Sequence, residues 1–310
     1  MRAPTFELRA CELTLSLGER ASGRAGGHLI MGIVNASPDS FSDGGMHAGL
    51  HAQVRLAHEL LEAGADIIDI GGESASTGRP PLQADEEIEL VTPLIERVAG
   101  ELGALVSVDT YKPAVARAAI AAGARIVNDV SGLRDPELAQ VCAQSGAALV
   151  LMHTRAAPRQ RLQDPDLYAD VTGEVLAFLH ERAQLACEWG VAREQLIFDP
   201  GPDFTKTPAQ TIELLASSER LHELGGPLLM AISRKDFIGA LTGRSPRQRL
   251  PGTLAALGHG IDSGAHIFRV HDVAAAVEFL SVRTALAGHS EPGRALELAD
   301  ELRHEREPLG

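Results

Sequence analysis

The sequence contains few cysteines, few aromatic residues and no long apolar run. Its three cysteines, Cys11, Cys142 and Cys187, are far apart and form no CxxC or Cys/His cluster, so we expect free thiols in a reducing cytosol. Aromatic residues make up 4% of the chain, too few for a surface on which nucleic-acid bases stack. No stretch approaches the roughly 18 uninterrupted apolar residues of a membrane span, and residues 1–20 contain no apolar segment typical of a signal peptide. These absences favour a cytoplasmic protein without a membrane partner.

Positive charge is also scarce. The chain has 28 Lys and Arg residues against 42 Asp and Glu, a net charge of −14. Such an acidic surface repels phosphate backbones, which argues against a nucleic-acid partner. A small anionic substrate therefore requires the few cations to gather at one place. What the sequence does have is apolar residues, which make up 45% of its 310 positions and can form a sizeable core.

Helix-like stretches that end in Gly-Ala recur along the chain, each followed by a short apolar run. Four of these glycines are Gly64, Gly123, Gly146 and Gly264. Glycine just after a helix adopts the left-handed conformation that ends it, and apolar runs with little alternation are typical of strands buried on both faces. The runs predict about eight strands, at residues 29–34, 67–70, 104–109, 125–128, 149–153, 195–199, 227–233 and 266–270.

Alternation of strands with helices predicts a parallel sheet. About eight such units in roughly 250 residues fit a single (β/α)8 barrel, the TIM barrel. A doubly wound open sheet is the alternative, weakened because no GxGxxG follows the first strand. Residues 5–18 partly alternate and predict a β-hairpin across the barrel floor. We therefore expect an N-terminal hairpin extension at 1–28, a barrel at 29–285 and a charged C-terminal tail at 286–310.

Almost every predicted strand ends in a polar residue. These residues are Asn35, Asp69, Asp109, Asn128, His153, Asp199, Ser233, Lys235, Arg269 and His271. Barrel enzymes carry their chemistry at the C-terminal ends of the strands. A single Asp after a strand is more often a turn former, but a full ring of polar groups around one mouth costs desolvation without structural benefit. The ring therefore predicts an active site.

The predicted ring has two chemical halves. One half contains Asp109, Asn128 and Asp199, which together with a lysine suit a flat, nitrogen-rich heterocycle. The other contains Asn35, Arg269 and His271, which suit a phosphate or pyrophosphate. Because Asn35 is neutral, a metal here is expected to be Mg²⁺ held mainly by substrate oxygens. The loop at 35–45 has the composition of a lid, and its Phe41 is expected to close over a ligand.

Several longer motifs occur in order at the strand ends: MGIVNASPDSFSDGG, IIDIGGES, SVDTYKP, IVNDVSG, LVLMH, DPG, SRKDFIG and RVHDV. Together they resemble the dihydropteroate synthase family, folate-pathway enzymes of the pterin-binding barrel type. The resemblance covers roughly residues 5–285. It implies a transferase that joins 6-hydroxymethyl-7,8-dihydropterin pyrophosphate to p-aminobenzoate and releases pyrophosphate, with Mg²⁺ as cofactor. It also implies a homodimer formed through late helices.

The resemblance assigns roles to individual residues. It implies that the catalytic residues are Asp109, Asp199, Lys235, Arg269 and His271. The pterin would be held by Asp109, Asn128, Asp199 and Lys235. The pyrophosphate would be held by Arg269, His271 and Arg79, and by Asn35 through the metal. The p-aminobenzoate pocket would contain Phe41, Phe204, Ser233 and Lys235, with the carboxylate at Ser233 and the start of the following helix.

The sequence departs from the family pattern at two loops. The second loop, Ser74–Pro80, lacks the usual Ser-Thr-Arg-Pro, so Ser76 stands at the arginine position and Arg79 is the candidate substitute. The sixth-strand loop carries Asp203 and Thr205 where the family has glycine. These changes predict an altered p-aminobenzoate and sulfonamide pocket. They leave open a non-catalytic or differently specific pterin-binding paralogue. A pterin-dependent methyltransferase fits less well, because it needs no pyrophosphate site.

Three further polar residues near the strand ends allow simpler interpretations. We expect His153 to be structural. Arg234 is expected to point away from Lys235 and to form a salt bridge. Lys206 is expected to contact either substrate or solvent.

Overall fold

The computed structural model describes residues 4–18, 27–36, 45–73, 81–158, 160–288 and 297–299. Within the described ranges the chain forms ten strands. They are β1 (Phe6–Ala10), β2 (Leu13–Leu17), β3 (Leu29–Asn35), β4 (Ile67–Gly71), β5 (Leu105–Asp109), β6 (Ile126–Asp129), β7 (Ala148–Met152), β8 (Leu196–Asp199), β9 (Leu229–Met230) and β10 (Ile267–Val270). The α-helices in these ranges are α1 (Gly45–Glu62), α2 (Ala84–Gly100), α3 (Pro113–Ala122), α4 (Glu137–Ser145), α5 (Val171–Glu188), α6 (Pro208–Ala216), α7 (Asp236–Thr242), α8 (Leu250–Asp262) and α9 (Val273–Leu286).

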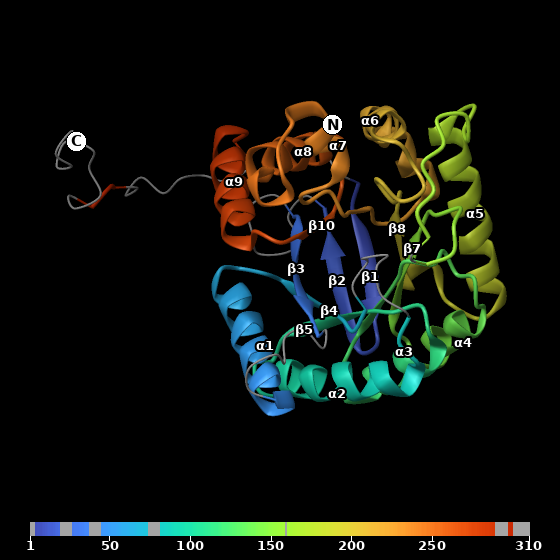
Figure 1. Ribbon diagram of the computed structural model, residues 1–310, viewed down its shortest axis with the longest axis vertical. Helices are drawn as coiled ribbons and strands as arrows, with labels where there is room; N and C mark the ends of the chain where they lie inside the picture. Colours follow the sequence, from blue (N-terminus) through green and yellow to red (C-terminus); the bar gives the residue numbers. More distant parts are fainter. Residues whose placement is uncertain are drawn as a thin grey trace.

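Eight of these strands form one parallel barrel. Their order is β8-β7-β6-β5-β4-β3-β10-β9, and a parallel bridge between Phe198 and Leu228 connects β8 to the residues just before β9. The helices surround the strands (Figure 1). The predicted barrel and the positions of its eight strands are therefore confirmed, and the open-sheet alternative is wrong.

Strand β9 is much shorter than the predicted run at 227–233. Only Leu229 and Met230 pair with β10. Beyond them the chain leaves the ladder: the hydroxyl of Ser233 bonds to His271, and Arg234 turns into the left-handed region with φ 59°. The apolar run predicted a full strand, but its last residues form the wall of the cavity described below.

The predicted hairpin is present and covers the floor of the barrel. Strands β1 and β2 pair antiparallel, and Figure 1 shows them crossing the middle of the ring of helices. Leu8 and Leu17 are fully buried in one apolar cluster with Met31 of β3. The N–H of Cys11 donates to the carbonyl of Gly146 at 2.7 Å, just before β7 begins. The hairpin thus covers the N-terminal ends of the strands and leaves the opposite mouth open.

The predicted helix ends are also confirmed. Positive φ angles occur at all four glycines, 100° at Gly64, 123° at Gly123, 77° at Gly146 and 81° at Gly264. Of the predicted tail at 286–310, the structure describes only residues 286–288 and 297–299, and Leu286 is the last residue of α9. Within the part of the chain that the structure describes, no helix combines the length and apolar character needed to cross a bilayer.

Candidate active site

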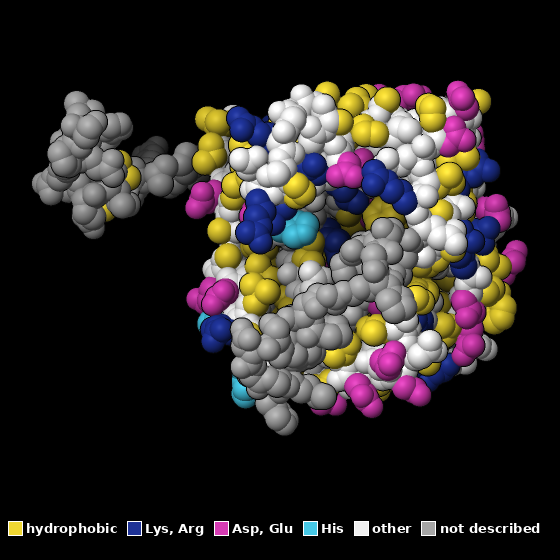
Figure 2. Space-filling view, in the orientation of Figure 1, with side chains coloured by type: hydrophobic (Ala, Val, Ile, Leu, Met, Phe, Trp, Pro, Cys, Tyr) yellow, Lys and Arg dark blue, Asp and Glu magenta, His cyan; other side chains and the backbone are white. Residues whose placement is uncertain are grey.

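A cavity of about 570 Å³ opens at the C-terminal ends of the barrel strands. Nine of the residues predicted from the sequence line it: Asn35, Asp109, Asn128, Asp199, Phe204, Ser233, Lys235, Arg269 and His271. Figure 2 shows this hollow, with Lys, Arg and His side chains gathered on its α7–α9 side. The structure thus brings the predicted ring together at one mouth. Phe41 and Arg79 lie outside the described residues.

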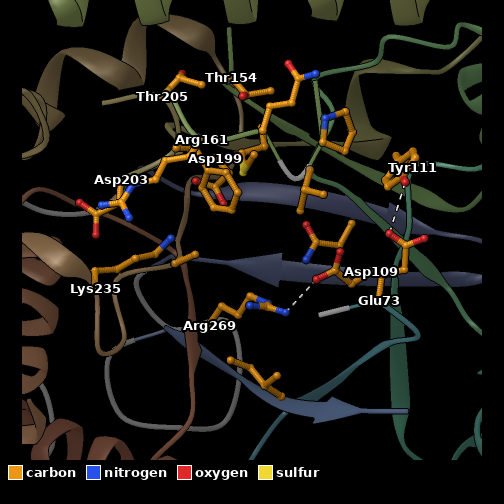
Figure 3. A pocket seen from close by; sticks show the side chains of 18 of the residues that line it. Glu73, Asp109, Tyr111, Thr154, Arg161, Asp199, Asp203, Thr205, Lys235 and Arg269 are labelled. Carbon is orange, nitrogen blue, oxygen red and sulfur yellow. Dashed lines mark hydrogen bonds and ion pairs between the residues drawn. The ribbon is translucent and has the colours of Figure 1, made fainter. Parts of the chain in front are cut away.

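Arg269 crosses the base of the cavity and joins two carboxylates. Its Nε donates to Oδ2 of Asp69 at 2.6 Å, and its Nη2 donates to Oδ2 of Asp109 at 2.9 Å. Figure 3 shows Arg269 reaching toward Asp109. Asp69 is fully buried and also accepts from Nδ2 of Asn128 at 3.2 Å. The sequence placed Asp69 at a strand end without a role; a charged residue inside the apolar run IIDI was the signal that could have identified it.

Two carboxyl groups of the cavity have raised pKa values. Burial raises the pKa of Asp109 to about 7, while the charge of Arg269 acts in the opposite direction. Burial also raises the pKa of Asp199, although the N–H of Gly201 donates to its Oδ1 at 2.7 Å and acts against the shift. Both carboxylates are poorly solvated in the free protein, so N–H bonds from a ligand would stabilise their ionised forms.

Lys235 and Phe204 form a second wall. The ammonium of Lys235 lies 4.4 Å from the centre of the Phe204 ring and donates to the carbonyl of Pro202 at 2.9 Å. Burial lowers the pKa of Lys235, and the charges of Asp203 and Asp199 counteract that effect. The lysine and the aromatic ring are thus in contact, and together they form a wall against which a flat ring can pack.

His271 and Ser233 also line the cavity and bond to each other. The hydroxyl of Ser233 accepts from the backbone N–H of His271 at 3.2 Å and lies 3.0 Å from its Nδ1. Burial lowers the pKa of His271 to about 4, and the charges of Arg234 and Arg269 contribute. His271 is therefore neutral near pH 7 and offers a hydrogen bond rather than a charge. Arg234 forms the expected salt bridge, a two-bond pair with Asp272 at 2.7 and 3.0 Å.

Lys206 is buried beneath the sixth-strand loop, so neither predicted contact, substrate or solvent, is correct. Its side chain is 0% exposed. Its ammonium donates to the carbonyls of Gly201 and Phe204 at 2.9 and 3.1 Å and lies 2.8 Å from Nδ1 of His153. His153 is buried as well, which agrees with its expected structural role. The lysine thus fixes the loop that carries Asp203 and Phe204.

The two residues that replace family glycines in this loop adopt the left-handed conformation. Asp203 has φ 64° and Thr205 has φ 52°, values that are uncommon for residues other than glycine. Both are held by their own side chains. The Asp203 carboxylate accepts the N–H of Asp236, the first residue of α7, at 2.5 Å. The Thr205 hydroxyl accepts the N–H of Arg155 at 3.0 Å.

A charged cluster that sequence reasoning missed lines the far side of the cavity. The ammonium of Lys112 lies 2.5 Å from a carboxylate oxygen of Glu73 and 2.5 Å from one of Glu87. The hydroxyl of Tyr111 donates to Glu73 at 3.3 Å (Figure 3). Lys112 also donates to the carbonyl of Leu82 at 2.8 Å. The Glu73 carboxylate accepts the backbone N–H of Leu82 at 2.9 Å. Lys112 and Glu73 therefore both bond to Leu82, which connects the two ends of the second loop.

The described residues contain no group of three or more His, Cys, Asp or Glu side chains that could bind a metal ion by themselves. Asn35 ends β3, is exposed and lines the cavity, so it can supply one neutral oxygen. One protein oxygen fits a Mg²⁺ ion whose other ligands are phosphate oxygens and water. The donor set therefore fits a metal that arrives with the substrate, with Asn35 as its protein ligand.

Comparison with known proteins agrees with this arrangement. The sequence profile described as "Pterin binding enzyme" matches residues 31–271. A dihydropteroate synthase from Synechocystis is 43% identical over 259 residues, which are 83% of this chain and 89% of that protein. The dihydropteroate synthase of Xanthomonas albilineans, solved with 4-aminobenzoic acid, is 42% identical with a TM-score of 0.80 and covers 91% of this chain and 98% of its own.

The barrel, the cavity and these matches together define the class of enzyme to which the chain belongs. The chain belongs to the pterin-binding enzyme family. Within it, the similar proteins are dihydropteroate synthases; a second Xanthomonas albilineans structure, in complex with 7,8-dihydropteroate, is 44% identical with a TM-score of 0.75 over 84% of this chain and 94% of its own. The sequence resemblance to that family is therefore confirmed.

Proposed function

We propose that the chain is a dihydropteroate synthase: it joins 6-hydroxymethyl-7,8-dihydropterin pyrophosphate to 4-aminobenzoate and releases pyrophosphate. The proposal depends mainly on one observation: a single cavity contains both the residues suited to a heterocycle and those suited to an anion. Arg269 connects the two sets, because it lies in the anion half and bonds to Asp109 of the heterocycle half. The relatives support it, since one is solved with 4-aminobenzoic acid and another with 7,8-dihydropteroate.

The pterin occupies the deeper half of the cavity. Asp199 and Asn128 are each 3% exposed, so their bonds to a ligand form away from water. The carboxylates of Asp109 and Asp199 accept the N–H groups of the pterin. Asn128 uses its Nδ2 on Asp69, which leaves its Oδ1 to accept, and Lys235 donates to a ring acceptor. Each such bond to a charged group contributes about 1.5–3 kcal/mol.

The pyrophosphate leaves from the side of Arg269 and His271. The bond between the pterin methylene carbon and the bridging oxygen breaks, and its electron pair passes to the pyrophosphate. Arg269 supplies a positive charge there, and neutral His271 supplies an N–H donor. Asn35 would hold a Mg²⁺ ion that arrives with the substrate, and the ion would supply further positive charge to the leaving group. The carboxylates Asp109 and Asp199 stabilise the electron-deficient pterin.

The acceptor amine attacks the methylene carbon from the Phe204 side. Arylamines are neutral near pH 7, so no base is needed to prepare the nucleophile, and the proton is lost after the new C–N bond has formed. The ring packs against the wall formed by Phe204 and the stem of Lys235. Phe41 is proposed to cover it, and Ser233 belongs to the same pocket in this proposal.

Arg79 is proposed as the cation of the second loop, in place of the arginine that Ser76 replaces. A guanidinium forms paired bonds to pyrophosphate oxygens that serine cannot form. Arg79→Ala should then slow turnover at least about tenfold, about 1.4 kcal/mol, and Arg79→Ala/Ser76→Arg should recover part of it. Full activity of Arg79→Ala at limiting pterin substrate would show that this loop does not bind the leaving group.

The enzyme is proposed to be cytoplasmic and homodimeric. Exposed apolar side chains on the late helices support a dimer: Leu241 of α7 is 68% exposed, and Val282 and Leu286 of α9 are 61% and 84% exposed. Light scattering of the full chain measures its oligomeric state directly. A monomer at micromolar concentration would contradict the dimer.

The experiment that tests the activity is a coupled assay of pyrophosphate release, run with and without 4-aminobenzoate. Release that requires the amine, together with formation of dihydropteroate, is expected. Pterin binding without release would indicate the non-catalytic paralogue instead, and methyl transfer from a methylated pterin would indicate the methyltransferase.

A further inference from the structure

A charged cluster lies beside the pterin half of the cavity and has no part in the transfer steps proposed above. Glu73, Glu87 and Tyr111 line the same cavity as Asp109, and Lys112 is the cation between the two glutamates. Figure 3 shows Glu73 and Tyr111 on the same side of the cavity as Asp109. A buried ion pair adds little to stability, because desolvation offsets the attraction between its charges. Stability alone therefore does not account for this cluster.

The three N–H donors of the Lys112 ammonium all have acceptors. They are carboxylate oxygens of Glu73 and Glu87, each at 2.5 Å, and the carbonyl of Leu82 at 2.8 Å. The Lys112, Glu73 and Glu87 side chains are only 16%, 10% and 2% exposed, so solvent screens these contacts little. Lys112 follows the end of β5 by three residues, whereas its partners lie just after β4 and around the start of α2. The lysine therefore joins the end of β5 to the segments that follow β4.

The end of β4 packs closely against Asp109 and Glu87. Gly71 lies opposite Asp109 in the parallel ladder, and a Cβ added to Gly71 would lie 3.3 Å from the Cβ of Asp109. A Cβ added to Gly72 would lie 2.7 Å from Cγ of Glu87, closer than carbon atoms pack. Strand β4 also carries Asp69, which bonds to the same guanidinium as Asp109. A displacement of the end of β4 would therefore change how both carboxylates meet that guanidinium.

The cluster also contributes to the charge around Asp109. Burial is the main cause that raises the pKa of Asp109. Four charged groups also act on it, and they are Arg269 of β10, Asp69 of β4, Glu87 of α2 and Asp129 of β6. The guanidinium lowers this pKa, and the three carboxylates raise it. Burial raises the pKa of Glu87 as well, but the bond from Lys112 acts against that shift and favours the ionised glutamate.

We propose that Lys112 is a positioning residue for the transfer reaction: through Glu73 and Glu87 it holds the end of β4 against Asp109, where the pterin binds. The inference rests on the proposed function and adds a residue to the pterin half of its site. Lys112 acts through these neighbours rather than on the substrate, because its three donors are used within the chain. Without the ammonium, two carboxylates that repel each other remain beside Asp109, and the end of β4 loses its attachment to β5.

The test is calorimetry of the full chain with 6-hydroxymethylpterin at pH 6 and pH 8. Lys112→Met should weaken pterin binding at least about tenfold at pH 8, as expected for residues in one bonded network. Lys112→Arg keeps the positive charge and should lose less. Glu87→Gln keeps an oxygen for Lys112 but removes a negative charge near Asp109. It should therefore lower the pKa of Asp109, which tightens pterin binding about two- to fivefold at pH 6 and changes it less than about twofold at pH 8.

Arg117→Met and Glu89→Gln are the matched controls. Arg117 is exposed on α3 and Glu89 is exposed on α2, so they repeat the two charge changes on the same helices outside the cavity. Both should bind the pterin like wild type at both pH values. The thermal midpoint checks the folding of each variant, and if Lys112→Met does not fold, the pH profile of Glu87→Gln decides.

Two results would overturn the inference. One is a folded Lys112→Met that binds the pterin within about twofold of wild type, which is less than residues in one network normally contribute. The other is a Glu87→Gln variant whose pterin binding has the wild-type pH profile. Pyrophosphate release is measured separately: a wild type that binds the pterin but releases no pyrophosphate contradicts the proposed function, whereas the binding comparison still decides the role of Lys112.

Discussion

Asp69 and Arg269, which are 200 positions apart in the sequence, are joined by a 2.6 Å bond between Oδ2 and Nε at the base of the cavity. Asp69 is fully buried, so its charge is compensated mainly by this guanidinium and by the amide of Asn128. The pair holds the guanidinium so that Nη2 meets Asp109. Arg269 is therefore oriented before any substrate binds, and its orientation connects the anion half of the site to the pterin half.

The first prediction concerns this guanidinium. Arg269→Ala should weaken pyrophosphate binding by about 2–4 kcal/mol, the usual effect of removing one partner of a buried charged contact. Calorimetric titration with pyrophosphate and Mg²⁺ measures it. Arg117→Ala, which removes an exposed arginine paired with Glu137, is the control and should bind normally. Near-normal pyrophosphate binding by a folded Arg269→Ala would remove Arg269 from the anion site.

The second prediction concerns the pterin half. Asp199→Asn keeps the side-chain shape and its bond from Gly201, but it loses the charge and one acceptor. The variant should fold normally and bind the pterin at least about tenfold more weakly, about 1.4 kcal/mol or more. Calorimetry with 6-hydroxymethylpterin tests this, with the thermal midpoint as the check on folding. An unchanged pterin affinity would place the pterin elsewhere.

The third prediction follows from the pKa of Asp109, which is raised to about 7 in the free protein. Pterin N–H groups bond to the ionised form, so binding should lower this pKa and release a proton near neutrality. Pterin affinity should therefore fall as the pH decreases below about 7, approaching tenfold per pH unit for one proton. Titrations from pH 8 to 6 in two buffers measure both effects. Asp109→Asn should bind weakly with little pH dependence; a flat wild-type profile contradicts the assignment.

The barrel could be predicted from the sequence because its signals are local. Each glycine that ends a helix is followed by its strand, and the polar residue that ends the strand marks the mouth, as at Asp109 and Asp199. The ring of site residues followed from the same regularity. The hydrogen bonds between these site residues could not be predicted, because they join side chains of strands that are distant in the sequence, such as Asp69 and Arg269.

The two residues that the sequence described least well show the same limit. Lysine is usually exposed to solvent, yet the long side chain of Lys206 passes under the loop. Its ammonium donates there to two carbonyls and lies beside Nδ1 of His153. Asp203 was recognised as a departure from the family, but its bond to Asp236 depends on how α7 begins after β9. Both contacts join segments whose relative position exists only in the folded barrel.

The last prediction concerns the buried ammonium of Lys206. Lys206→Met leaves the carbonyls of Gly201 and Phe204 and the ring nitrogen of His153 without their donor, so it should lower the free energy of unfolding by about 2–4 kcal/mol.

Burial lowers the pKa of Lys206 to about 7, whereas the unfolded lysine titrates near 10.4. Between these values the unfolded chain binds more protons, so this group adds stability as the pH rises from about 7 to 10. The loss caused by Lys206→Met should therefore be larger at pH 9 than at pH 7, by up to about 1.4 kcal/mol per unit. Urea unfolding at both pH values measures it, with Arg117→Met as an exposed control whose effect should not change with pH. An equal loss at pH 7 and pH 9 would show that Lys206 keeps an ordinary pKa in the folded protein.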